Sequence, residues 1–301
     1  MNTTLYVRLT AFLALAIGAI PLKTNAGSCF VWRATNTAAP CYLVGTIHSL
    51  HARDYPLPAG YDQALRDSKR LVFEMNPDPS SDYEGKFVRA ATYPKGDYVQ
   101  NHVNPKTWEI IKVNFQMHNM IGQPFNVSGY YVEHGVEQLR PWAIQGIFYG
   151  IPGYSGIFDD LGVDNHFWYE GKRHHKEIAG LETDEEHIAV LGGMNDTESE
   201  LMLVDAIVNR QKLRVRGEML IAAWKHGDLE SVASGLRDDY KLNPGAELRL
   251  LDMRNKKWIP KIKAEFSSGK PTSIVVGCAH MLGPNGLVGL LKREGYQFQQ
   301  L

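Results

Sequence analysis

The sequence predicts an α/β protein, a single domain whose mixed and mostly buried central sheet is flanked by helices. Short runs of apolar, β-branched and aromatic residues alternate along the chain with longer stretches of helical period. Two of the short runs, CYLVGTIH and SIVVGCAH, have the pattern of buried strands and end in Gly-x-x-His. Continuous apolar strands of this kind are typical of a sheet that is covered by helices on both faces.

Each element is predicted from its own pattern. The apolar runs predict strands over 30–34, 41–47, 70–75, 176–181 and 272–278. Apolar residues at helical spacing predict helices over 59–68, 105–120, 162–171, 184–192, 196–225, 228–237, 245–267 and 284–294. Capping signals support two of the helix starts. Asn104 precedes a proline at the first position of the helix predicted over 105–120. Asp196 and Thr197 begin the helix predicted over 196–225, whose first residues are acidic.

The composition is that of a globular protein that can bury a full core. The chain has 301 residues, of which 44% are hydrophobic and 22% charged, and its formal net charge is −1. It has 32 Lys and Arg against 33 Asp and Glu, and its longest basic cluster is KRHHK at 172–176. Such a chain offers no basic surface for a phosphate backbone, so we expect no nucleic-acid partner. The sequence does not indicate an oligomeric state.

Residues 1–26 are predicted to be a secretory signal peptide. A single positive charge precedes an apolar run over 9–22 that is too short to span a bilayer, and Ala26 suits cleavage. The mature chain, 27–301, is then expected to be exported to the periplasm or secreted, without a transmembrane segment. Cys29 would permit a lipid anchor, but the leucine that usually lies three positions before a lipidated cysteine is missing.

The mature chain is expected to form one domain, because no low-complexity linker divides it and its length suits a single α/β domain. Residues 95–160, which are rich in Tyr, Phe, Gly and Pro, are expected to be either an insertion that covers a site or loops that only pack. Cys29 and Cys41 flank a predicted hairpin and would form a disulfide if its register brings them together. Cys278 is interpreted as a small apolar residue at a buried strand end.

Polar side chains are predicted at the carboxyl ends of four buried strands, namely His48, Glu74, Glu182 and His280. Ligands of open α/β sheets bind beyond these strand ends, so the four side chains should converge. Imidazole and carboxylate together suit zinc, manganese, iron or cobalt. The sequence therefore predicts a metal site, in which the rings of His48 and His280 lie within about 8 Å of each other. Taken singly, each histidine is more typical of a hydrogen-bonded structural residue than of a ligand.

Several segments together resemble the TraB/GumN family, whose eukaryotic relatives include the Tiki proteases. In chain order they are YLVGTIHSLH, VFEMN, GVDNHFW, GLET, AWKHGDLE, RNKKW and VVGCAHMLGPNGLVGLLKREGY. The resemblance extends from about Phe30 to Tyr296 and is weakest between about 80 and 135. It implies an α/β fold related to the erythromycin esterase and ChaN-like group. For the Tiki branch it implies a peptidase that depends on a divalent metal, with Mn, Co and Zn all open.

The resemblance also implies roles for individual residues: His48, Glu74 and His280 as metal ligands or near neighbours, and Gly45 and Gly277 as backbone elements of the site. Glu182 would be either the general base or a carboxylate that orients a histidine. Arg254 would hold a substrate carboxylate or a developing oxyanion, or would form an ion pair that ties its helix to the sheet. Cys278 departs from the family, in which a small residue such as alanine is more usual at this position.

The expected activity is metal-assisted hydrolysis of a peptide or a related acyl bond, with Glu182 taking the proton from the attacking water. The alternative is a protein that binds haem, a metal or a peptide without catalysis. Among the other candidates, His51 could be a ligand only if residues 48–51 turn helically, and is otherwise expected at the surface. His174 and His175 are expected in solvent. Asp164 is expected to cap or pin a helix, with contact to the site as the alternative.

Overall fold

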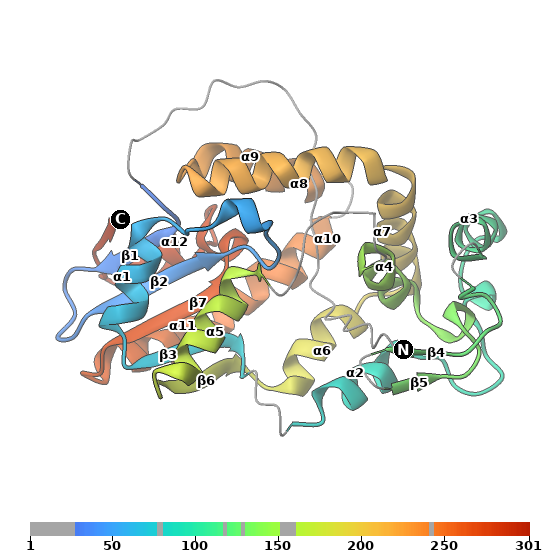
Figure 1. Ribbon diagram of the computed structural model, residues 1–301, viewed down its shortest axis with the longest axis horizontal. Coiled ribbons are helices and arrows are strands. Elements are labelled where there is room, and N and C mark those ends of the chain that lie inside the picture. Colours follow the sequence, from blue (N-terminus) through green and yellow to red (C-terminus); the bar gives the residue numbers. More distant parts are fainter. Residues whose placement is uncertain (1–27, 77–80, 117–118, 128–129, 151–160, 241–243) are drawn as a thin grey trace. The chain divides into compact units, whose positions relative to one another are not determined.

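Six strands form one mixed sheet, which confirms the predicted α/β class with a central sheet flanked by helices (Figure 1). Their order is β6-β3-β7-β2-β1-β8, and their bounds are β1 Val31–Ala34, β2 Cys41–Thr46, β3 Arg70–Met75, β6 Glu177–Glu182, β7 Thr272–Gly277 and β8 Phe298–Gln300. The four strands from β6 to β2 are parallel to one another, whereas β1 is antiparallel to both β2 and β8. Five of the six strands were predicted, and the three-residue β8 was missed.

This computed structural model describes residues 28–301 apart from 77–80, 117–118, 128–129, 151–160 and 241–243. The signal peptide predicted at 1–26 lies outside the described residues, as does part of the 95–160 segment. Among the residues that are described, no helix combines the length and the hydrophobicity needed to cross a bilayer.

The chain contacts define two compact units. The sheet unit, formed by the described residues within 28–76, 161–183 and 215–301, contains the whole six-stranded sheet. The helical unit contains the described residues within 81–150 and 184–214. Its elements are α2 Tyr83–Ala91, α3 Pro105–Gln116, the hairpin of β4 Phe125–Val127 and β5 Tyr130–Val132, α4 Pro141–Gly150, α6 Asp184–Gly192 and α7 Asp196–Val208. Most of the predicted insertion at 95–160 belongs to the helical unit; that it covers a site, and that 27–301 form one domain, stay predictions.

The helices of the sheet unit are α1 Ala59–Asp67, α5 Val163–Arg173, α9 Leu229–Tyr240, α10 Pro244–Glu247, α11 Met253–Ser267 and α12 Leu287–Arg293. A π-helix, Leu248–Asp252, joins α10 to α11 without a break, so the helix predicted over 245–267 is continuous. The helix predicted over 196–225 is wrong as a single element, because α7 ends at Asn209, whose backbone N–H donates to the carbonyl of Asp205 at 2.9 Å. A second helix, α8 Arg210–Lys225, follows.

Helices cover both faces of the sheet. Side chains alternate along a strand, so neighbouring residues of β3 face opposite sides. A Cβ on Gly171 of α5 would meet the side chain of Leu71. The preceding residue, Arg70, instead donates two hydrogen bonds to Glu265 of α11, at 2.9 and 3.0 Å. Glu74 lies an even number of residues from Arg70 and therefore points to the α11 face.

The disulfide that the sequence allowed between Cys29 and Cys41 is not formed, because the hairpin register keeps the two residues apart. Cys41 is paired with Ala34 across β1 and β2. Cys29 precedes Ala34 by five residues, which is roughly 17 Å along an extended strand. Both thiols are free and buried, as is that of Cys278. Burial raises the pKa of the Cys278 thiol to about 12, which agrees with its interpretation as a small apolar residue.

Candidate functional site

The two Gly-x-x-His motifs lie side by side at the carboxyl edge of the sheet. Strands β2 and β7 are parallel, with Thr46 opposite Gly277, so His48 and His280 leave the sheet at the same edge. Strand β3 flanks β7 on its other side, and Oε1 of Glu74 accepts a hydrogen bond of 2.8 Å from the backbone N–H of Gly277. The predicted convergence of these strand ends is therefore found in the structure.

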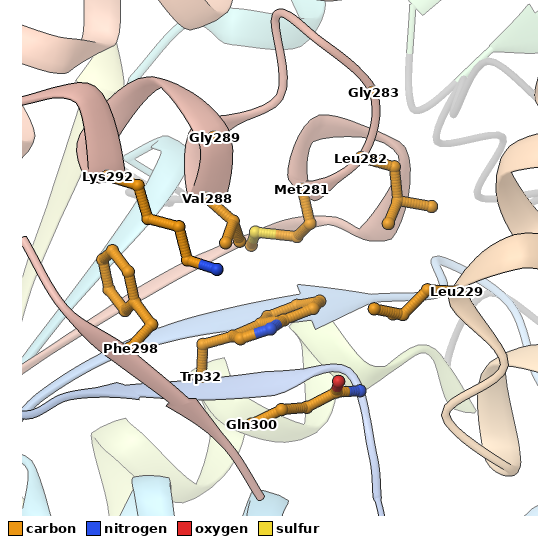
Figure 2. Close-up of a pocket in the computed structure, with 10 residues that line it drawn as sticks. All are labelled: Trp32, Leu229, Met281, Leu282, Gly283, Val288, Gly289, Lys292, Phe298 and Gln300. Carbon is orange, nitrogen blue, oxygen red and sulfur yellow. The ribbon is translucent and has the colours of Figure 1, made fainter. Parts of the chain in front are cut away.

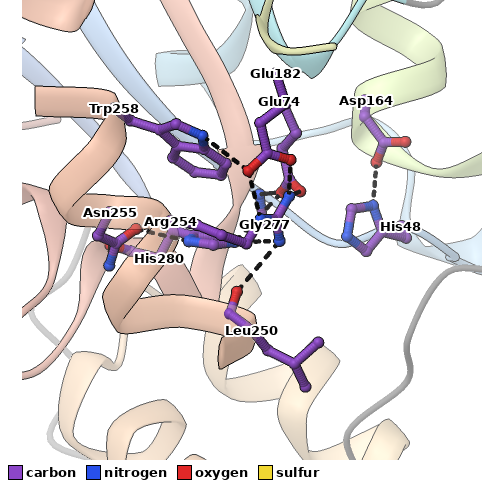
Figure 3. A network of polar contacts seen from close by, with 10 residues as sticks. All are labelled: His48, Glu74, Asp164, Glu182, Leu250, Arg254, Asn255, Trp258, Gly277 and His280. Carbon is purple, nitrogen blue, oxygen red and sulfur yellow. Dashed lines mark hydrogen bonds and ion pairs between the residues drawn. The ribbon is translucent and has the colours of Figure 1, made fainter. Parts of the chain in front are cut away.

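Three side chains predicted as ligands surround Gly277 (Figure 3). A Cβ added to this glycine would lie 3.3 Å from Oε1 of Glu74, 3.4 Å from Nε2 of His48 and 3.8 Å from Cδ2 of His280. Because all three atoms lie within 4 Å of one point, the two rings satisfy the predicted limit of about 8 Å. Gly277 keeps this space open, since any side chain here would project among the three groups.

The ring of His280 is held in one orientation by Asn255 of α11. Nδ1 of His280 lies 2.7 Å from Oδ1 of Asn255, whose amide nitrogen donates to the carbonyl of Asn285 at 2.9 Å. An amide oxygen only accepts, so the proton of the neutral ring resides on Nδ1. Burial lowers the pKa of His280 to about 3, despite the opposing charge of Glu74, so the ring is neutral. Its Nε2 lies 3.7 Å from Oε1 of Glu74 and 3.3 Å from Nη1 of Arg254.

His48 has a similar arrangement with an acidic partner. Its Nδ1 lies 3.1 Å from Oδ1 of Asp164, in the first turn of α5, which leaves Nε2 on the side of Gly277. Of the alternatives for Asp164, capping is not observed, because Gly162 occupies the cap position, whereas contact with the site is observed through His48. The side chain of His48 is 30% exposed, compared with 4% for His280. The cluster is therefore accessible to solvent at His48.

Arg254 joins the two carboxylates of the cluster. Its Nε and Nη2 donate to the two oxygens of Glu182 at 2.8 and 2.9 Å, and Nη2 also donates to Oε2 of Glu74 at 2.6 Å. The guanidinium lies 4.7 Å from the ring centre of Trp258, whose indole N–H donates to Glu182 at 3.1 Å. Of the roles open for Arg254, the ion pair between helix and sheet is the one observed. Glu182 accepts hydrogen bonds from this arginine and from Trp258.

The electrostatics of the cluster favour a cation. Burial would raise the pKa of Glu74, but the charge of Arg254, together with His280 and His48, holds it well below its usual range. Burial would likewise lower the pKa of Arg254, but Glu74 and Glu182 raise it above its usual value. Two carboxylates therefore share one guanidinium beside a neutral imidazole. The cluster retains one negative charge that a bound cation would balance.

Gly45 supports the site through its backbone. Its carbonyl accepts hydrogen bonds from the hydroxyl of Tyr61 at 2.7 Å and from Nε1 of Trp224 at 3.0 Å, and both side chains are buried. A Cβ at this position would lie 3.2 Å from the backbone of both Phe30 and Cys278. The missing side chain thus lets β2 approach the end of β7, three residues before His48.

The remaining candidates lie elsewhere. The expectation of a surface position for His51 is wrong, because its ring is 13% exposed and lies 2.8 Å from Oε1 of Glu218 in α8. His174 and His175 are exposed, as predicted. Asn255 was not singled out as a functional residue, although it directly follows Arg254 in the RNKKW motif. Its position next to Arg254, on the same helix turn, was the feature of the sequence that could have identified it.

Two of the three candidate donor atoms have a spacing that one divalent cation could bridge. Nitrogen and carboxylate oxygen atoms bind such ions at about 2.0–2.2 Å, so two ligands of one ion lie roughly 3 to 4 Å apart. The 3.7 Å between Nε2 of His280 and Oε1 of Glu74 falls in that range. In the described part of the chain, no group of three or more His, Cys, Asp or Glu side chains is arranged so that it could hold a metal ion as it stands. The guanidinium of Arg254 contacts two of the three candidate ligands.

Comparison with known proteins shows the family to which the chain belongs. The family model described as the TraB/PrgY/gumN family matches residues 30–300, so the chain belongs to this family. It is 22% identical over 303 residues to the metalloprotease TIKI1 of Danio rerio, covering 86% of this chain and 60% of that protein. It is 21% identical over 315 residues to the metalloprotease TIKI homolog of Nematostella vectensis, covering 90% and 66%. The chain thus spans less than two thirds of the length of these relatives. No solved structure matches it.

Proposed function

We propose that this chain is an exported, metal-dependent hydrolase that cleaves peptide or related acyl bonds. In this proposal His48, Glu74 and His280 hold one divalent ion, which is manganese, cobalt or zinc. The main observation in its favour concerns the rings of His48 and His280. In each ring Nδ1 lies beside an oxygen acceptor, and both rings lie next to Gly277 together with Glu74. Metal-binding histidines have this second hydrogen bond almost without exception. The names of the metalloprotease relatives support the peptide bond as substrate.

A divalent ion, when bound, polarises a substrate carbonyl and acidifies a water molecule. The residues of this chain prepare the site for it. Asp164 and Asn255 keep the ring protons on Nδ1, so that Nε2 of each histidine is the basic atom. Arg254 keeps Glu74 ionised. The exposure of His48 supports entry of water and substrate on its side.

Glu182 acts in this proposal as a positioning residue, because its oxygens accept hydrogen bonds from Arg254 and Trp258. Its role as general base stays a prediction, as does oxyanion binding by Arg254.

The proposed export rests on the apolar run at 9–22. Cell fractionation that finds the shortened chain in the periplasm or medium would support export, and full-length chain in the cytoplasm would contradict it.

The proposal is tested by cleavage assays on the full mature chain. The protein is stripped with a chelator, reloaded with Mn²⁺, Co²⁺ or Zn²⁺ one at a time, and incubated with a fluorogenic peptide library and a set of simple esters. We expect cleavage in at least one reloaded sample and none in the stripped protein. Cleavage by the stripped protein at the same rate would contradict the proposal.

The second candidate is a protein that binds a metal, haem or a peptide without catalysis. It is favoured by the buried ion pairs of Arg254, which already neutralise much of the charge on Glu74 and Glu182. A stoichiometric ligand in the protein as isolated, a Soret band in the case of haem, together with no cleavage after any reloading, would support this candidate against the hydrolase.

Replacing Gly277 with alanine should weaken metal binding by at least about tenfold with little loss of folding stability. The new methyl group would lie 3.3 Å from Oε1 of Glu74 and 3.4 Å from Nε2 of His48, in the space between the ligands. Both neighbours are side-chain atoms that can shift slightly, so the fold should tolerate it. Isothermal titration with Mn²⁺ and thermal unfolding measure the two effects. Unchanged affinity in a folded variant would contradict the proposed ion position.

Replacing Asn255 with leucine should lower metal affinity about 10- to 100-fold, because Nδ1 of His280 then loses its acceptor. Asn255→Asp keeps an acceptor oxygen at the same place and serves as the matched control, for which we expect much of the affinity to return. Titration with Mn²⁺ and urea unfolding separate the loss of binding from a loss of folding. Equal affinities in the two variants would show that the ring orientation does not matter.

A further inference from the structure

A pocket of about 330 Å³ opens in the sheet unit between β1, β8 and α12 (Figure 2). Its apolar lining consists of Trp32, Leu229, Met281, Leu282, Val288 and Phe298. Gly283 and Gly289 complete the wall. The volume falls in the range of sites for small organic ligands. None of these residues belongs to the candidate metal site.

One positive charge projects into this apolar space. Lys292 of α12 extends toward Trp32, with Nζ in the pocket (Figure 2). Within the described ranges no acidic side chain pairs with it. The acidic residue two positions later, Glu294, forms its ion pair with Lys263 instead. An ammonium group beside apolar walls without a counter-charge is a ready partner for an anion.

A second donor is supplied by the floor of the pocket. The side chain of Trp32 is only 5% exposed, and no described residue accepts a hydrogen bond from its indole N–H. An indole N–H in such a place usually finds an acceptor. Gln300 beside it is fixed by a hydrogen bond of 2.9 Å from its amide nitrogen to the carbonyl of Cys29. The pocket thus presents two donors that lack acceptors within the described chain.

We propose that this pocket binds a small organic acid with a single carboxylate and an apolar body. The carboxylate would accept from Lys292 and Trp32, and the body would contact the apolar walls. One cation suits a monoanion better than a phosphate chain, which would need several. Two sources share this chemistry: a free medium-chain fatty acid and the apolar C-terminal residue of a peptide.

The proposal does not depend on the metal site, although Met281 in the pocket wall directly follows His280. Binding is therefore measured on metal-stripped, full mature chain by isothermal titration. The probes are octanoate and N-acetyl-leucine, with octanamide and N-acetyl-leucinamide as neutral controls of the same shape. The variant Lys292→Met changes an exposed side chain and should fold normally, and Lys95→Met removes an exposed lysine of the helical unit as a matched control.

We expect at least one acid to bind the wild-type chain, with its amide and the Lys292→Met variant each weaker by at least about tenfold. The Lys95→Met variant should bind like the wild type. The acid that binds more tightly identifies the source, a fatty acid or a peptide C-terminus. Absence of binding by both acids, or equal binding by Lys292→Met, would overturn the proposal.

Discussion

Alanine at either His48 or His280 should abolish metal binding and peptide cleavage together. Removing a residue that only orients a ligand already costs about 10- to 100-fold in affinity, so removing a ligand should cost at least about 100-fold. The effect should be as large for the partly exposed His48 as for the buried His280, because both would supply Nε2 to the same ion. Titration with Mn²⁺, Co²⁺ and Zn²⁺ and the peptide assay provide the two readouts.

The controls separate ligand loss from damage to the fold. His280 is buried against Trp258, at 4.5 Å between ring centres, so His280→Gln is used beside the alanine variant to fill the space. His174→Ala removes a histidine that is 55% exposed, and it should leave both readouts unchanged. Full metal affinity or full cleavage in a folded His48 or His280 variant would refute the proposed ligand set.

Replacing Arg254 with methionine should lower the free energy of unfolding by about 3–5 kcal/mol, which is typical of breaking a buried ion pair on one side only. The guanidinium is 9% exposed and is the shared partner of Glu74 and Glu182, which are 14% and 5% exposed. Without it, two carboxylates would remain in a poorly hydrated space. Urea unfolding followed by circular dichroism gives the value.

A second substitution tests that explanation. Adding Glu182→Gln to Arg254→Met removes one of the stranded charges, so the double variant should be more stable than Arg254→Met alone. Arg89→Met is the matched control, since Arg89 is 65% exposed in its ion pair with Asp82 and should change stability by less than about 0.5 kcal/mol. A loss below about 1 kcal/mol for Arg254→Met would mean that the carboxylates are compensated by other groups.

The parts of the site that lie at strand ends could be predicted from the sequence. Apolar runs of β-branched residues identify buried strands, and parallel strands bring their carboxyl ends to one edge. His48 and His280 could therefore be placed together although 231 residues separate them in the chain. The side chains that orient them could not be found in this way. Asp164 and Asn255 lie on helices, and their contacts depend on how each helix is rotated against the sheet.

The register of the hairpin and the exact ends of the helices could not be predicted from the sequence either. The spacing of Cys29 and Cys41 is compatible with a bridged hairpin, and only the observed pairing of Cys41 with Ala34 excludes it. The helical period continues through Asn209, where α7 ends and the backbone N–H of this residue donates to the carbonyl of Asp205. Such single contacts leave no periodic trace in a sequence. The three-residue strand β8 is likewise too short for alternation to be recognised.

The central claim is that imidazoles from the two ends of the sheet unit share one ion with Glu74. Anomalous diffraction from crystals of the mature chain soaked in Mn²⁺ or Zn²⁺ tests it most directly. We predict one strong peak at about 2.0–2.2 Å from Nε2 of His48, Nε2 of His280 and an oxygen of Glu74. Well-diffracting soaked crystals with no peak near Gly277, while Arg254 keeps its contacts to Glu74 and His280, would contradict the claim.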